Sequence, residues 1–200
     1  GNERHYHKIV RTAYRKFVML VIVSTIPTGV IGILFKDTVE LAGTMLVVPG
    51  ICLLITSVFL VIADYADEGT KRPREASYVN AGLIGVAQGI ATMPGLSRSG
   101  TTITACLLCG FEKKFAVKYS FIMSIPAVLG AVVLELKDVA KAPLQASAVP
   151  ACAVATVISA IVGYLSICIM MRLIQGKKYK IFAVYCAIVG LITVGYGIFR

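Results

Sequence analysis

The chain has 200 residues, of which 58% are hydrophobic and only 15% are charged, and its formal net charge is +10. A soluble domain has about a quarter of its residues charged, so this composition excludes an ordinary water-soluble fold. The lysines and arginines stand in short clusters between apolar runs, which is where membrane topology places them. The positive charge therefore indicates a membrane protein, and we expect no nucleic-acid partner.

The chain begins with a basic arm, residues 1–16, which we place in the cytoplasm. Five apolar runs follow it, each near the roughly 20 residues that a helix needs to cross the bilayer core. We predict an all-α fold, a polytopic transmembrane helical bundle that forms a single integral membrane domain over 1–200. No signal peptide is visible, and because the chain opens on Gly1 we expect that a segment upstream is missing or has been removed. The predicted spans are 17–35, 41–63, 119–135, 148–171 and 181–199.

Between the second and third runs lies a segment, 76–111, that carries the motif PGLSRSGTT. If this segment is a re-entrant hairpin, 15 lysines and arginines are cytoplasmic and four lie outside; if it crosses once, the numbers are 11 and eight. The positive-inside rule favours the hairpin. As helices, Gly82–Met93 and Thr101–Gly110 would be about 18 and 15 Å long. The two arms would then meet near the middle of a hydrocarbon core that is about 30 Å thick.

Small and helix-breaking residues define this hairpin. Gly82, Gly85 and Gly89 give the first arm a face for close packing against a neighbouring helix. Pro94 is expected to end this arm, because it lacks an N–H and disfavours a helical conformation in the preceding residue. Gly95 permits backbone angles that are closed to other residues.

The second helix of the hairpin is expected to begin near Thr101, with Ser99 as its N-cap. Its free N–H groups and the positive end of its dipole would point at the tip of the hairpin, a place that receives anions and phosphate above all. Arg98 adds a full charge and a two-pronged donor that matches phosphate oxygens. Ser97, Ser99, Thr101 and Thr102 add hydroxyl donors. The motif therefore predicts a phosphate site inside the membrane.

Two polar residues have a second interpretation. In the alternative interpretation, the Arg98 side chain reaches the membrane surface or pairs with a buried acid. An arginine at mid-membrane costs about 3 kcal/mol, so proteins rarely retain one there without a function. Gln88 either faces the same cavity, as a substrate contact, or bridges packed helices. The six cysteines all lie in apolar runs, and Cys106 and Cys109 have no second pair nearby, so we predict neither disulfides nor a metal site in this chain.

At these residues the sequence resembles a known family. The stretch GVAQGIATMPGLSRSGTTITACLLCGF is similar to the second signature, PGxSRSxxT, of bacterial undecaprenyl-diphosphatases of the bacitracin-resistance type. The stretches FAVKYSFIMSIPAVLGA (115–131) and STIPTGVIGILFKD (24–37) resemble the same family. The signature falls on Pro94, Gly95, Ser97, Arg98, Ser99 and Thr102.

The resemblance implies an integral membrane phosphatase that converts undecaprenyl diphosphate to the monophosphate, recycling the lipid carrier of cell-wall polymers. It implies a bacterial plasma-membrane location with the site towards the extracytoplasmic side, and a homodimer is possible. We assign Arg98, Ser97 and Ser99 to catalysis and Thr102, Thr101, Gly95 and Gln88 to substrate binding. A divalent cation, Mg or Ca, is expected, with its ligands outside this chain.

One departure from the family limits these expectations. The family's first signature, an acidic pair (E/Q)xxxE followed by Val-Ser-Ser-Thr-Gly-His, does not occur here, and His5 and His7 lie in the basic arm. We therefore expect a fragment that corresponds to the C-terminal three-quarters of a family member and is inactive alone. The alternative function is a transporter or flippase of polyprenyl phosphate lipids, which binds the same headgroup without hydrolysing it.

Overall fold

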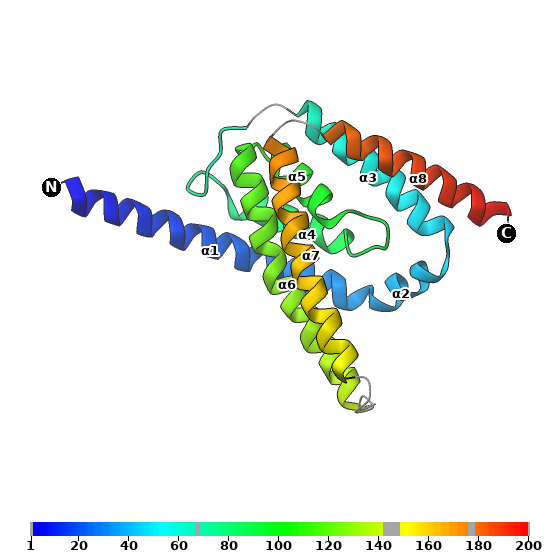
Figure 1. The fold of residues 1–200 in the computed structure, drawn as a ribbon. Helices are drawn as coiled ribbons and strands as arrows, with labels where there is room; N and C mark the ends of the chain where they lie inside the picture. Colours follow the sequence, from blue (N-terminus) through cyan, green and yellow to red (C-terminus); the bar gives the residue numbers. More distant parts are fainter. Residues whose placement is uncertain (1, 67–68, 142–148, 176–178, 200) are drawn as a thin grey trace. The chain divides into compact units, whose positions relative to one another are not determined.

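The structure, a computed structural model, describes residues 2–66, 69–141, 149–175 and 179–199. The side chains of 1–12, those of His5 and His7 among them, lie outside the described part. Within these ranges the chain is helical (Figure 1), and the strand-like pairing is a single bridge between Lys71 and Phe111. In chain order the helices are α1 (Asn2–Leu34), α2 (Lys36–Thr44), α3 (Val47–Tyr65), α4 (Tyr78–Ile90), α5 (Arg98–Leu108), α6 (Lys113–Lys141), α7 (Val149–Gln175) and α8 (Tyr179–Phe199).

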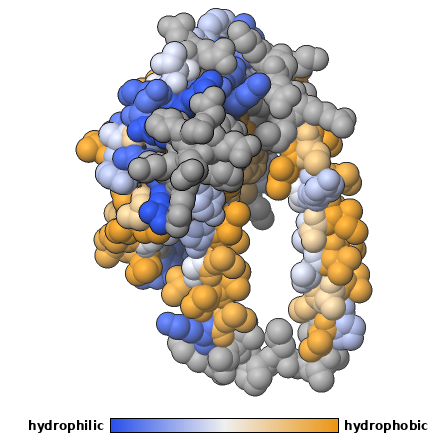
Figure 2. Space-filling view, turned by 90° about the vertical axis from the view of Figure 1, so that its left-hand side faces the viewer, coloured by the Kyte–Doolittle hydropathy of each residue, from blue (hydrophilic) through white to orange (hydrophobic). Residues whose placement is uncertain are grey.

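Five helices are long and apolar enough to cross a membrane, which confirms the prediction of an all-α, multi-pass membrane protein. Large apolar side chains along them are exposed, and Figure 2 shows them in orange along the helices of the face in view. Because so much apolar surface has no polar cover, the bilayer is the solvent that suits it. The spans are Ala13–Leu34, Val47–Tyr65, Lys113–Lys137, Val149–Ile169 and Tyr179–Phe199.

The second span starts later than predicted from its apolar run, 41–63. Residues 41–44 belong to α2, and α3 begins at Val47. The break follows from Pro49, which has no N–H to donate to the carbonyl of Met45 and so prevents one helix from running through this point. Pro49 instead lies in the first turn of α3, where backbone N–H groups have no helical partner in any case.

The chain forms two compact units, one of residues 1–127 with 179–200 and one of residues 128–178. The first unit holds α1 to α5, the first half of α6, and α8. The second holds the rest of α6 and α7, whose apolar side chains, such as Ile161 at 56% and Leu165 at 53%, are exposed. The motif PGLSRSGTT lies wholly in the first unit. The single domain over 1–200, with its cytoplasmic arm, stays a prediction.

Glycines let helices of the first unit pack closely. α8 runs beside α3 (Figure 1, red and cyan), and a Cβ added to Gly50 would lie 2.9 Å from a backbone nitrogen of α8. α4 approaches α1 in the same way at Gly85 and Gly89, where an added Cβ would lie 2.2 and 2.7 Å from atoms of α1. A Cβ on Gly82 meets nothing within 4 Å. The predicted packing face therefore includes Gly85 and Gly89 but not Gly82.

The lysines and arginines of the sequence form four basic clusters, within 4–16, 71–74, 113–118 and 172–180. One basic side chain from each cluster lies at the same end of the first unit, where it contacts a residue of a neighbouring segment. This shared end is what the hairpin topology requires, because a single crossing by 76–111 would divide the clusters between two sides. The contacts are Lys16 with the Tyr78 ring, Arg72 with Glu112, Lys113 with the Tyr179 ring, and Lys180 with Asp64.

Candidate functional site

The segment that carries the motif is a helical hairpin whose two ends are held together. The Lys71 N–H donates to the Gly110 carbonyl at 3.0 Å, and the Glu112 N–H donates to the Lys71 carbonyl at 3.0 Å. The Lys71 amine also donates to the Cys109 carbonyl at 2.8 Å. The chain thus enters α4 and leaves α5 at the same place. The segment is therefore a helical hairpin and not one uninterrupted helix over 76–111, while its re-entrant position in the membrane stays a prediction.

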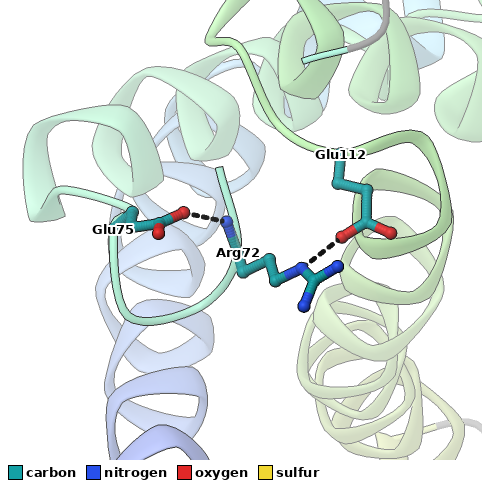
Figure 3. A network of polar contacts seen from close by, with 3 residues as sticks. All are labelled: Arg72, Glu75 and Glu112. Atoms are coloured by element: carbon teal, nitrogen blue, oxygen red, sulfur yellow. Dashed lines mark hydrogen bonds and ion pairs between the residues drawn. The ribbon is translucent and has the colours of Figure 1, made fainter. Parts of the chain in front are cut away.

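Side chains reinforce the base of the hairpin (Figure 3). The Arg72 Nε lies 2.7 Å from the Glu112 Oε2, and the Arg72 N–H donates to the Glu75 carboxylate at 2.9 Å. The Arg72 side chain is 72% exposed, so water weakens this ion pair. The base is held mainly by the main-chain pairing, and the ion pair adds to it.

The tip of the hairpin begins earlier than predicted. α4 ends at Ile90, not beside Pro94, because two tight turns follow it: the Thr92 N–H bonds to Gly89 and the Met93 N–H to Ile90, both at 3.2 Å. The Thr92 hydroxyl also donates to the Gly89 carbonyl, at 2.7 Å. The polar side chain of Thr92 and the restriction before Pro94 together favour turns over another helical turn.

Gly95 fits the tip for two reasons. Its φ of +92° lies in the left-handed region, which glycine adopts without strain. A Cβ added to it would also lie 2.3 Å from the Pro49 carbonyl oxygen, at the start of α3. The tip is therefore packed backbone against backbone on α3.

The second helix starts three residues earlier than expected, and its cap is a different serine. α5 begins at Arg98, and Ser97 is the N-cap, in an extended conformation with its Oγ accepting from the Gly100 N–H at 3.1 Å. The Ser97 carbonyl accepts the first helical bond, from the Thr101 N–H at 2.9 Å. The expected cap, Ser99, therefore lies inside the first turn. Both serines have the residue type that caps require, and the extended backbone at Ser97 decides between them.

Several donors at the start of α5 have no partner among the described residues. The N–H groups of Arg98 and Ser99 precede the first helical bond, and the half-buried Arg98 side chain makes no hydrogen bond or ion pair with a described residue. The buried Thr101 hydroxyl is also without a partner in the described part of the chain. Together with the positive end of the α5 dipole, these groups offer an anion donors that have no partner among the described residues.

The other two predicted contacts point into helix packing. The Thr102 hydroxyl is fully buried and bonds to Ser120 of α6. Gln88, also 0% exposed, donates to the Thr28 hydroxyl of α1 at 3.3 Å and to the Met123 carbonyl of α6 at 3.5 Å. These bonds join α4 to α1 and α6, as the helix-bridging interpretation of Gln88 predicts. Its substrate role stays a prediction, as does that of Thr102.

Two threonines that the sequence reasoning did not single out connect the hairpin to its neighbours. Thr56 of α3 donates to the Gly95 carbonyl at 3.2 Å and accepts from the Ser97 N–H at 2.9 Å. Thr104 of α5 donates to the Phe59 carbonyl of α3 at 3.0 Å. The sequence could have indicated them, because a buried hydroxyl group needs a hydrogen-bond partner, and a threonine inside an apolar run is therefore a candidate for contacts between helices.

Positions along α3 show how far the hairpin tip lies from the end of the first unit that carries the basic side chains. The last residue of α3, Tyr65, is at that end, with the Lys180 amine 4.6 Å from the centre of its ring. Along the axis of α3, Thr56 lies about 14 Å and Pro49 about 24 Å from Tyr65 at 1.5 Å per residue. The start of α5 therefore lies beside the middle of α3, and Gly95 lies towards the end of α3 remote from Tyr65.

No group of three or more His, Cys, Asp or Glu side chains gathers in the described ranges. These residues therefore do not form a metal centre, and we assign no step to a metal. The candidate site consists of one arginine, two N–H groups without a partner in the described part of the chain, and hydroxyls, at the tip of the hairpin.

Such a fold defines a polytopic membrane protein, and the tip of its hairpin carries basic and hydroxyl side chains that suit an anionic group. The sequence model of bacitracin resistance protein BacA matches residues 2–192, and the chain belongs to this family. It is 41% identical over 194 residues to an undecaprenyl-diphosphatase of Methanosphaera stadtmanae, covering 96% of this chain and 67% of that protein. For those of Halothermothrix orenii and Methanobrevibacter smithii the identities are 39% and 42%, covering 90% of this chain and 70% and 65% of the relatives. The chain thus spans about two thirds of the length of these relatives.

Proposed function

We propose that the protein hydrolyses undecaprenyl diphosphate to undecaprenyl phosphate and inorganic phosphate, the activity named for its relatives. The observation that carries the proposal is the start of α5, where Arg98 and the N–H groups of Arg98 and Ser99 have no partner among the described residues. A diphosphate headgroup presents several anionic oxygens to such a cluster. The site then binds the group on which the reaction takes place.

We assign a role in this reaction to the residues at the start of α5. The bond between the bridging oxygen and the terminal phosphorus breaks, and the lipid phosphate leaves with the bridging oxygen. Phosphoryl transfer depends on positioning and on stabilising charge around phosphorus, and the Arg98 guanidinium supplies both. Ser99 and Thr101 donate hydrogen bonds to phosphate oxygens. Because the Ser97 oxygen accepts from Gly100, its own hydrogen stays available for donation.

The attacking oxygen belongs either to water or to a serine of the motif, with phosphoserine then hydrolysed in a second step. The two routes give the same products. Oxygen from labelled water enters the released phosphate in both, so trapping of a phosphorylated Ser97 or Ser99 is the observation that separates them.

The proposal includes the setting of the reaction. The exposed apolar helices offer the prenyl tail a path through lipid. The proposed location is a bacterial plasma membrane. With the basic clusters in the cytoplasm, we propose that the site opens towards the extracytoplasmic side, and the contact of Gly95 with Pro49 at the far end of α3 supports this. A divalent cation, Mg or Ca, accompanies the diphosphate, and a homodimer is the proposed assembly.

The test uses the protein encoded by the complete reading frame, in detergent with polyprenyl diphosphate. The wild type should release inorganic phosphate, and Arg98→Ala should lose this release while its elution profile and helical circular dichroism stay unchanged. Wild-type protein that binds and moves the lipid without releasing phosphate would support the transporter instead. Normal turnover by Arg98→Ala would reject the assignment of the site.

A further inference from the structure

Thr56 lies on a transmembrane helix and belongs to no sequence motif, yet it touches the hairpin tip on both sides of Leu96. Its hydroxyl donates to the Gly95 carbonyl at 3.2 Å and accepts from the Ser97 N–H at 2.9 Å. The residue is 1% exposed, so no water replaces either bond. One hydroxyl group thereby satisfies two main-chain groups of a turn that would otherwise be unpaired inside the membrane.

The two bonds fix the residues that precede the anion site. Gly95 is in the left-handed conformation, and Ser97 caps α5 through its Oγ. The direction of the Ser97 backbone determines where α5 starts, and therefore where the N–H groups of Arg98 and Ser99 point. A threonine that holds both neighbours of Leu96 sets that direction without touching the anion.

We propose that Thr56 is a positioning residue of the phosphatase site, which holds the cap of α5 so that Arg98 and the first N–H groups face the diphosphate. This inference rests on the proposed function. A misplacement of about 1 Å costs up to roughly 100-fold in rate when catalysis depends on alignment. The effect should therefore appear in turnover even though Thr56 does not contact the substrate.

The chain offers a matched control in Thr104. This threonine is 2% exposed, and it also joins α5 to α3, by donating to the Phe59 carbonyl at 3.0 Å. It lies in the second turn of α5, and its hydroxyl bonds to the Phe59 and Gly100 carbonyls and not to a described residue between 91 and 98. Thr104→Val removes a buried hydroxyl from the same pair of helices and leaves the cap of α5 in place.

The experiment compares Thr56→Val, Thr56→Ser and Thr104→Val in the protein encoded by the complete reading frame. One readout is phosphate release from polyprenyl diphosphate, and the other is amide hydrogen exchange of a peptide covering 91–98. Thr56→Val should lower kcat at least tenfold and accelerate exchange in that peptide. Thr56→Ser, which keeps the hydroxyl, and Thr104→Val should stay within threefold of the wild type in kcat and unchanged in exchange.

Two results would overturn the proposal: a Thr56→Val variant within threefold of the wild type, or a Thr104→Val variant impaired as strongly as Thr56→Val. If Thr56→Val does not fold, Thr56→Ala against Thr56→Ser isolates the same hydroxyl, and equal turnover of those two variants rejects the idea. If the wild type releases no phosphate but Thr56→Val still accelerates exchange at 91–98, the proposed function fails while the positioning of the tip by Thr56 stands.

Discussion

Gly85 of α4 and Ser24 of α1 are in backbone contact: a Cβ added to Gly85 would lie 2.2 Å from the Ser24 carbonyl oxygen. One turn further along α1, the Thr28 hydroxyl donates to the Gly85 carbonyl at 2.8 Å. The hairpin is thus anchored on α1 through a glycine and a threonine, which is how membrane helices approach one another closely.

Gly85→Val should therefore destabilise the protein far more than Gly82→Val. The valine at 85 forces α4 away from α1 and breaks the Thr28 bond, and overpacking of this kind costs about 1–3 kcal/mol or more. At Gly82 an added Cβ meets nothing within 4 Å. The measurement is the apparent melting temperature in detergent, with Gly82→Val as the control for a β-branched residue in α4. Equal losses for the two variants would contradict the close contact.

The ion pair at the base of the hairpin should matter little by comparison. The side chains of Arg72 and Glu112 are 72% and 28% exposed, and pairs of this kind contribute less than about 1 kcal/mol. Glu112→Gln should lower the melting temperature by no more than a few degrees, and added salt should remove the difference. A large loss would mean that the main-chain pairing of Lys71 with Gly110 and Glu112 does not hold the base.

The sequence was sufficient for the features that depend on hydropathy, charge and the motif itself. Apolar runs predicted five spans, and the distribution of lysine and arginine predicted a hairpin whose ends meet. Boundaries were less accurate where single residues decide them. Pro49 shortened the second span, and the turns at Thr92 ended α4 before Pro94.

The errors at the start of α5 have a common physical cause. Ser97 and Ser99 are equally suited to capping by residue type, and Ser97, the cap, bonds through its N–H to Thr56, which is 41 residues away in sequence. The packing of Gln88 and Thr102 likewise depends on partners in α1 and α6. Local patterns do not contain such long-range contacts, so the sequence could not predict what holds the start of α5 in place.

Arg98→Lys should retain only part of the activity that Arg98→Ala loses. A lysine keeps the positive charge but not the planar, two-pronged donor that matches phosphate oxygens. Removal of a group that stabilises the transition state costs about 100- to 1000-fold in kcat, so the alanine variant should fall in or below that range and the lysine variant between it and the wild type. Steady-state phosphate release gives both numbers. A lysine variant as slow as the alanine variant would show that geometry, and not charge, dominates.

Chelation should test the proposed cation. Treatment with EDTA should lower phosphate release from polyprenyl diphosphate, and Mg or Ca should restore it, because a divalent ion offsets the charge of a diphosphate. Melting temperature should stay unchanged, since the described residues form no metal centre that supports the fold. Full activity after exhaustive chelation would remove the cation from the proposal.

Gly95→Ala tests whether the tip needs its close approach to α3 as well as its unusual backbone. Gly95 and Gly110 both have positive φ, +92° and +81°. A left-handed alanine costs about 1–2 kcal/mol at either position. At Gly110 the nearest atoms to an added Cβ belong to the Lys71 side chain at 3.6 Å, whereas at Gly95 the Pro49 carbonyl oxygen is at 2.3 Å.

Gly110→Ala should therefore lower the melting temperature modestly and keep its turnover. Gly95→Ala should displace the tip from α3 and lower turnover at least tenfold, because the cap of α5 moves with it. Equal turnover in the two alanine variants would show that the anion site does not depend on the packing of the tip against Pro49.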